Sequence, residues 1–153
     1  MNDQQQPSMQ FNKPKAVDRA LNRAFGFLVR IGFGLPHNFL LEVRGHKSGR
    51  IYSTPVNVLE YNGHRFLVAP RGYTQWVRNV LASGEATLVK GGRREKVGLR
   101  AIASAAKAEV LKAYLDRFKL TVQRYFPVPA GTPVEEFHSI AAGYPVFELT
   151  QKE

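Results

Sequence analysis

Two glycine-containing turns, each between segments of alternating apolar and polar residues, most constrain the fold of this chain. The two predicted hairpins are 51–60 with 65–69 around Asn62-Gly63, and 86–90 with 94–102 around Gly91-Gly92. A two-residue turn with positive φ joins neighbouring antiparallel strands, and Asn-Gly and Gly-Gly adopt such turns readily. The chain is therefore expected to form an antiparallel sheet.

The remaining segments predict two more strands and three helices. Period-two patterns predict strands at 39–44 and 144–149. Helical spacing predicts an amphipathic helix from Lys15 to the glycines at 32–34, a second over 74–82 capped by Thr74, and a third opening at Ser104. Residues 127–133, with three prolines, are expected to be a loop. We expect a mainly β (α+β) domain over 15–153, an antiparallel barrel closed or nearly closed, preceded by a disordered arm at 1–14.

Composition limits the chemistry of the chain. Among 153 residues, 22 Lys and Arg against 12 Asp and Glu give a net charge of +10, which attracts nucleic acid, an acidic membrane face or a phosphorylated small molecule. Cysteine is absent, and the four histidines lack zinc-site spacing, so no metal is expected. No nucleophile elbow or carboxylate pair is recognisable. If the protein is an enzyme, a bound cofactor must carry the chemistry.

The basic hairpin and the first helix bear on possible partners. Basic residues gather over 90–100, but no aromatic residue lies among them, so no specific nucleic-acid binding is expected. No segment is long and apolar enough to span a membrane, and we expect a cytoplasmic protein. Residues 17–35 are read as a lid on the domain or as a peripheral contact with an anionic membrane.

Two segments are candidates for a binding site. The turn Gly45–Arg50 places Lys47 and Ser48 between two glycines, so its backbone amides could face a phosphate; a plain basic turn between strands is the alternative. On the predicted helix after it, Trp76 and Asn79 share one face and Arg71 and Arg78 lie nearby, although Trp76 could equally be a core aromatic.

Taken in order, these motifs resemble one known family. The series Leu-x-x-x-Gly-x-Lys-Ser-Gly-Arg, Ser-Thr-Pro, Val-Ala-Pro-Arg-Gly and Trp-x-x-Asn is similar to the deazaflavin-dependent nitroreductase family. These are FMN-binding-like split β-barrel oxidoreductases that use the deazaflavin coenzyme F-420. The resemblance covers about residues 40–102, and 145–149 resembles the family's last strand.

The resemblance implies a cofactor site. The cofactor's phosphodiester and acidic tail would be held by Lys47, Ser48 and Gly49, flanked by His46 and Arg50. Further contacts implied for the ring system are Pro55, Ala69, Pro70, Arg71, Trp76 and Asn79. By analogy, Tyr52, Tyr125 and Tyr144 would line an acceptor pocket. Two departures, His46 where many members have arginine and a short loop over 71–75, leave the substrate open.

The leading hypothesis is a reductase that transfers hydride from reduced F-420 to a quinone-like, nitro or other conjugated acceptor, lipophilic in character. A split barrel that uses FMN or haem is a second reading. A third is a barrel that binds an anion or lipid without chemistry. The sequence does not decide the oligomeric state.

Overall fold

The computed structural model describes residues 35–152, which form six strands, two α-helices and three short 3-10 helices. The strands are β1 (Asn38–Arg44), β2 (Ile51–Tyr61), β3 (His64–Val68), β4 (Glu85–Lys90), β5 (Arg93–Ala101) and β6 (Val146–Gln151). The helices are α2 (Gln75–Ser83), α3 (Ser104–Val122), η1 (Gln123–Tyr125), η2 (Val134–Phe137) and η3 (Ala141–Gly143). The predicted arm at 1–14 and helix at 15–34 lie outside the described residues.

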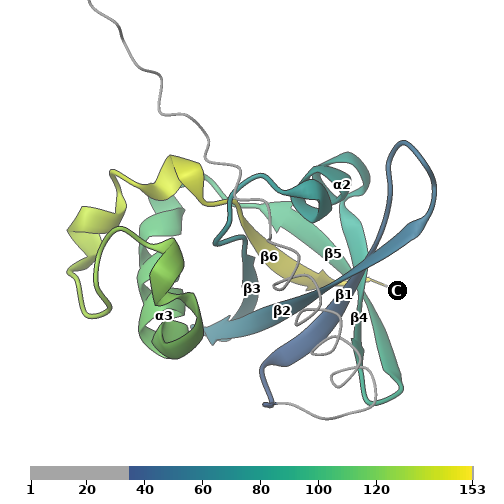
Figure 1. The fold of residues 1–153 in the computed structure, drawn as a ribbon, viewed down its shortest axis with the longest axis horizontal. Helices are drawn as coiled ribbons and strands as arrows, with labels where there is room; N and C mark the ends of the chain where they lie inside the picture. The colour runs from purple at the N-terminus through teal and green to yellow at the C-terminus, as the bar shows by residue number, and fades with distance from the viewer. Residues whose placement is uncertain (1–34, 153) are drawn as a thin grey trace, which may run out of the picture.

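The six strands close into an antiparallel barrel, as predicted (Figure 1). Their order around it is β1-β2-β3-β6-β5-β4, and β4 pairs with β1 to complete the circle. Both predicted hairpins are confirmed. Asn62 and Gly63 have φ values of 51° and 76°, and Gly91 and Gly92 have 54° and 80°, the positive values that such turns require.

One hydrophobic core fills the barrel. Leu41, Leu88, Val97 and Phe147 point inward from four different strands and are almost fully buried. Helix α2 adds Val77 and Val80 to this cluster, and Figure 1 shows it beside one end of the barrel. Because α2 is packed into the core, side chains at its start are held firmly beside the neighbouring loop.

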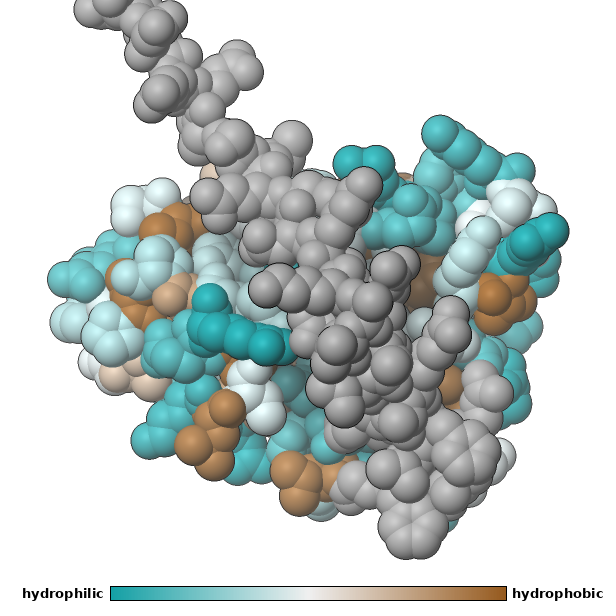
Figure 2. Space-filling model, in the orientation of Figure 1, coloured by the Kyte–Doolittle hydropathy of each residue, from teal (hydrophilic) through white to brown (hydrophobic). Residues whose placement is uncertain are grey.

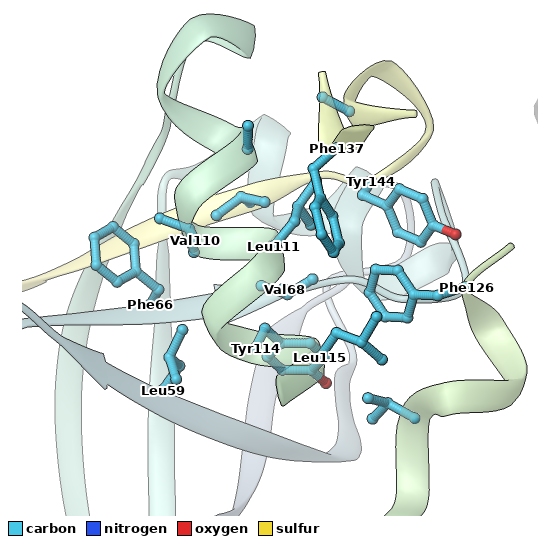
Figure 3. Close-up of a cluster of buried hydrophobic side chains, with 14 of the residues drawn as sticks. Leu59, Phe66, Val68, Val110, Leu111, Tyr114, Leu115, Phe126, Phe137 and Tyr144 are labelled. Carbon is cyan, nitrogen blue, oxygen red and sulfur yellow. The ribbon is translucent and has the colours of Figure 1, made fainter. Parts of the chain in front are cut away.

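A second core lies between α3 and the outside of the sheet (Figure 3). Helix α3 contributes Leu111 and Leu115, which contact Phe137 from η2. The rings of Phe126 and Tyr144 stack with centroids 4.6 Å apart and 3° between planes. The sequence did not predict Phe137 as a core residue, and the closing strand begins at Val146, two residues later than expected.

Strand β2 is longer than the stretch over which either neighbouring strand pairs with it, so part of one of its edges has no partner strand among residues 35–152. The bonds Val58 N–H to the carbonyl of His37 (2.9 Å) and Gly45 N–H to the carbonyl of Arg50 (2.6 Å) fix the register. Residues 52, 54 and 56 therefore turn their backbone groups toward β1, and residues 53, 55 and 57 turn theirs away. β3 pairs with β2 only from Val58 onward. Pro55 fits here because its position needs no N–H for the ladder.

The surface of the described chain is mixed. In Figure 2 its apolar side chains lie in separate brown patches between hydrophilic ones. Within residues 35–152 no helix has the length and hydropathy required to cross a bilayer. Most large apolar side chains of this part are in the two cores, with Leu35, Ile51, Tyr52, Leu81 and Leu120 the exposed exceptions.

Candidate functional site

A cavity of about 750 Å³ opens along the unpaired edge of β2. One wall comes from the loop after β3 and the start of α2, and the opposite wall comes from the end of α3 and the residues that lead into β1. Seven of the predicted site residues line it: Tyr52, Pro55, Ala69, Pro70, Arg71, Trp76 and Tyr125. The turn residues 46–50, Asn79 and Tyr144 do not line it.

The open edge of β2 supplies backbone hydrogen-bonding groups to the cavity. Ser53, Pro55 and Asn57 all line it, and their backbone groups point away from β1. The edge offers the N–H groups of Ser53 and Asn57 and the carbonyls of Ser53 and Pro55, since the register of β2 and β3 uses the carbonyl of Asn57. Such a row of donors and acceptors suits a flat heterocycle whose ring edge carries amide-like groups.

The wall formed by α2 combines an aromatic surface with an unused hydroxyl. Trp76 lines the cavity and also contacts Phe147 of the barrel core, with ring centroids 6.0 Å apart. Trp76 therefore lies between the cavity and the barrel core. Thr74 precedes α2 as predicted, but its side chain makes no capping bond. Its buried Oγ1 has no hydrogen-bond partner among residues 35–152, so it can serve a ligand in the cavity.

The predicted anion-binding turn is a tight loop between β1 and β2. Arg44 Nη1 donates to the carbonyl of Gly49 at 2.8 Å, and the N–H of Arg50 donates to Ser48 Oγ at 3.2 Å. Lys47 is exposed. Ser48 Oγ also lies 3.3 Å from the hydroxyl of Tyr52, which lines the cavity. The turn and the cavity are thus connected through Tyr52.

Gly45 is required for this contact. A Cβ at this position would lie 2.7 Å from both Ser48 Oγ and Tyr52 Cε2. Gly45→Ala is therefore expected to displace Tyr52 and lower the free energy of unfolding by about 1–3 kcal/mol, measured by urea denaturation. Gly143→Ala is the control, because a Cβ there meets nothing within 4 Å. Equal stability of the two variants would contradict this expectation.

Asn79 fastens the turn to α2. Its side chain is fully buried, and Oδ1 accepts from the backbone N–H of His46 at 3.2 Å and from His46 Nδ1 at 2.7 Å. Gln75 Nε2 donates to the same oxygen at 3.3 Å. His46 and Asn79 therefore lie together, and neither of them lines the cavity.

The wall formed by α3 contains a chain of polar groups that sequence reasoning missed. The N–H of Leu35 donates to Asn38 Oδ1 at 3.0 Å, and Asn38 Nδ2 donates to Asn57 Oδ1 at 2.8 Å. Asn57 in turn lies next to the phenol of Tyr114, whose pKa is raised above its ordinary value because the phenol is buried. All four residues line the cavity.

His37 adds a titratable group to the same wall. Its pKa is lowered from the usual value, first by burial and then by the positive charges of Arg117 and Lys90. Its ring packs against Phe118, with centroids 4.6 Å apart. Lys90 Nζ also donates to the carbonyls of Leu35 and Asn38, which fixes the start of β1.

The two remaining predicted tyrosines are linked to each other. The hydroxyl of Tyr144 donates to the carbonyl of Tyr125 at 2.5 Å, and its ring belongs to the core under α3. Tyr125 itself lines the cavity. Among residues 35–152, no group of three His, Cys, Asp or Glu side chains is placed to hold a metal ion.

Comparison with solved structures supports the barrel assignment. An F-420-H2 dependent reductase, FDR-A, superposes with a TM-score of 0.52 at 19% identity, covering 78% of this chain and 100% of its own. The heme storage protein HutZ from Vibrio cholerae superposes at 0.51 with 9% identity, covering 76% and 82%. At these identities the likeness concerns the fold alone. No curated protein sequence matched the chain.

The family assignment comes from the sequence. The model of the F-420H(2)-dependent quinone reductase family matches residues 16–126, which is more than half of the chain and includes β1 to β5 and all of α3. The matched range holds the turn, the cavity-lining part of β2 and both cavity walls. The predicted likeness to F-420-using split-barrel reductases is thereby confirmed. The chain belongs to the F-420H(2)-dependent quinone reductase family, which are oxidoreductases that use coenzyme F-420.

Proposed function

We propose that this protein reduces a flat, lipophilic, quinone-like acceptor at the expense of reduced F-420. The observation that carries the proposal is the cavity at the open edge of β2, whose two walls differ in chemistry. The α2 wall has an aromatic face beside basic residues. The α3 wall combines apolar side chains with neutral hydrogen-bonding groups. A cofactor on the first wall and an acceptor on the second would lie next to each other.

The anionic part of the cofactor is assigned to the turn. Lys47 and Arg50 are exposed there, and Ser48 and Gly49 lie between them. Gly49 has a φ of 72°, which bends the backbone around this point. His46 is held beside the turn by Asn79. Two cations in one short loop suit a phosphodiester with an acidic tail.

The ring system is assigned to the cavity itself. The unpartnered Thr74 Oγ1 and the open edge at Pro55 provide groups that a polar heterocycle can satisfy. The N–H of Ala69 donates to the carbonyl of Pro145 at 2.9 Å, so the Ala69-Pro70-Arg71 segment is fixed beside the ring position. Trp76 covers the end of the cavity. When bound, the reduced deazaflavin supplies the hydride; the residues of the chain orient the reactants and exclude water.

The acceptor is assigned to the space between the ring position and α3. Tyr52 and Tyr125 line this space, and Tyr144 acts on it by holding the carbonyl of Tyr125. The cavity lining is mainly apolar, with a few polar groups that could orient a conjugated ring. These features favour a quinone over a strongly charged acceptor.

Cofactor titrations test the proposal directly. Trp76 is the only tryptophan of the chain, so its fluorescence reports on the cavity. We expect saturable quenching by F-420, followed by activity with quinones. Because heme-binding proteins share this fold, FMN and haem are titrated in parallel. Quenching by FMN or haem alone would mean that F-420 is not the cofactor. No response to any of the three would favour a non-catalytic binder.

Lys47→Ala is expected to weaken F-420 binding about tenfold. An exposed lysine that pairs with an anionic ligand contributes roughly one charge-assisted hydrogen bond. The dissociation constant is measured by Trp76 quenching, and urea denaturation is expected to show unchanged stability. Lys119→Ala, which removes an exposed lysine of α3 outside the cavity wall, controls for net charge. Equal F-420 affinities of the two variants would mean that the turn does not bind the anionic part of the cofactor.

A further inference from the structure

Resting on the proposed function, we propose that the Tyr114 hydroxyl donates the hydrogen bond that holds a carbonyl oxygen of the acceptor. Asn38 and Asn57 act as positioning residues that direct the phenol proton into the cavity. Tyr114 comes from α3 and lines the cavity opposite α2. Figure 3 shows its hydroxyl oxygen at the edge of the buried cluster, pointing away from Leu111 and Phe137.

The direction of the polar chain is set at its backbone end. The N–H of Leu35 can only donate, so the atom of Asn38 that faces it is the oxygen Oδ1. The amide nitrogen of Asn38 is then a donor, and Asn57 Oδ1 accepts from it at 2.8 Å. Asn38 is 6% exposed, so water cannot readily exchange for these partners.

The contact between Asn57 and Tyr114 does not use the phenol proton of Tyr114. Asn57 Oδ1 already accepts from Asn38 Nδ2, so the amide group of Asn57 that remains for the neighbouring phenol is Nδ2, which can only donate. Burial raises the pKa of Tyr114, so the hydroxyl stays protonated and remains available as a donor.

The surroundings of this hydroxyl suit a conjugated carbonyl compound. Leu35 and Val122 give the α3 wall apolar contacts for a ring or its substituents. Reduction of a quinone adds a hydride and, from solvent, a proton, and negative charge grows on the oxygen before the proton arrives. A donor fixed on that oxygen stabilises the charge, and Tyr114 keeps its own proton throughout.

Tyr114→Phe tests the hydrogen bond while keeping the aromatic packing. We expect menadione to bind the cofactor-free protein about five- to tenfold more weakly, measured by Trp76 quenching. With F-420 present, kcat/KM for menadione should fall at least as much, and the dissociation constant of F-420 should not change. Tyr61→Phe, which removes a hydroxyl bonded to Glu109 outside the cavity, is the control.

Asn57→Asp tests the direction of the hydrogen bonds that run from Leu35 to Tyr114. The carboxylate still accepts from Asn38 but offers no N–H to Tyr114, so it takes the phenol proton for itself. We expect this variant to lose as much menadione affinity as Tyr114→Phe although its hydroxyl is present. Combining both changes should cost nothing further, since they remove the same hydrogen bond.

Several outcomes would overturn the assignment. They are full menadione affinity in either variant, additive losses in the double variant, or wild-type protein that does not bind menadione at all. A failure of the proposed function has a different signature, because F-420 would then neither quench Trp76 nor support turnover. Because the menadione titration does not need the cofactor, it still tests the role of Tyr114 in that case.

Discussion

Replacing Phe137 by alanine is expected to lower the free energy of unfolding by about 3–5 kcal/mol. Phe137 is fully buried and contacts the α3 core around Leu111 and Leu115. The backbone on either side belongs to a short 3-10 helix and a turn, which cannot close over the cavity that the missing ring would leave. Urea denaturation followed by circular dichroism measures the loss.

Leu120→Ala is the matched control for this prediction. Leu120 is on α3 itself but is 94% exposed, so its truncation should change stability by less than about 0.5 kcal/mol. If Phe137→Ala cost no more than the control, η2 would not be packed on α3. Because α3 forms one wall of the cavity, a destabilised core should also weaken menadione binding in the Phe137 variant.

The sequence predicted the strands and the α-helices of the described chain well for a physical reason. Hairpins such as the one at Asn62-Gly63 are local, and their turn residues and alternation agree with each other. The apolar face of α3 repeats over several turns, which makes it equally visible. Phe137 lacked such a signal, since one aromatic residue in a single 3-10 turn has no periodicity.

The residues of the candidate site also fall into two groups, those with a recognisable sequence pattern and those without one. Motifs on continuous segments, such as the turn around Lys47 and the Ala69–Arg71 segment, could be read directly. Asn38 and Asn57 are 19 positions apart and become partners only through the register of β1 and β2. Tyr114 carries the spacing of a core residue and has that role as well, so only the structure shows that it also lines the cavity.

Asn79→Leu is expected to release the turn from α2 and to lower the free energy of unfolding by about 2–4 kcal/mol. Leucine fills a similar volume but cannot accept hydrogen bonds, which leaves the N–H of His46 and the amide of Gln75 without this acceptor. Trypsin should then cleave after Lys47 and Arg50 faster than in the wild type, which mass spectrometry of the fragments would show. If Lys47 binds the cofactor, F-420 affinity should fall as well.

Asn79→Asp separates hydrogen bonding from packing. A carboxylate can accept from all three donors that Asn79 Oδ1 now serves. We therefore expect this variant to restore resistance to trypsin at the turn although it changes the same side chain. If instead both variants were cleaved at the wild-type rate, the turn would be held by its internal bonds, such as that from Arg44 to Gly49, and Asn79 would serve only the packing of α2.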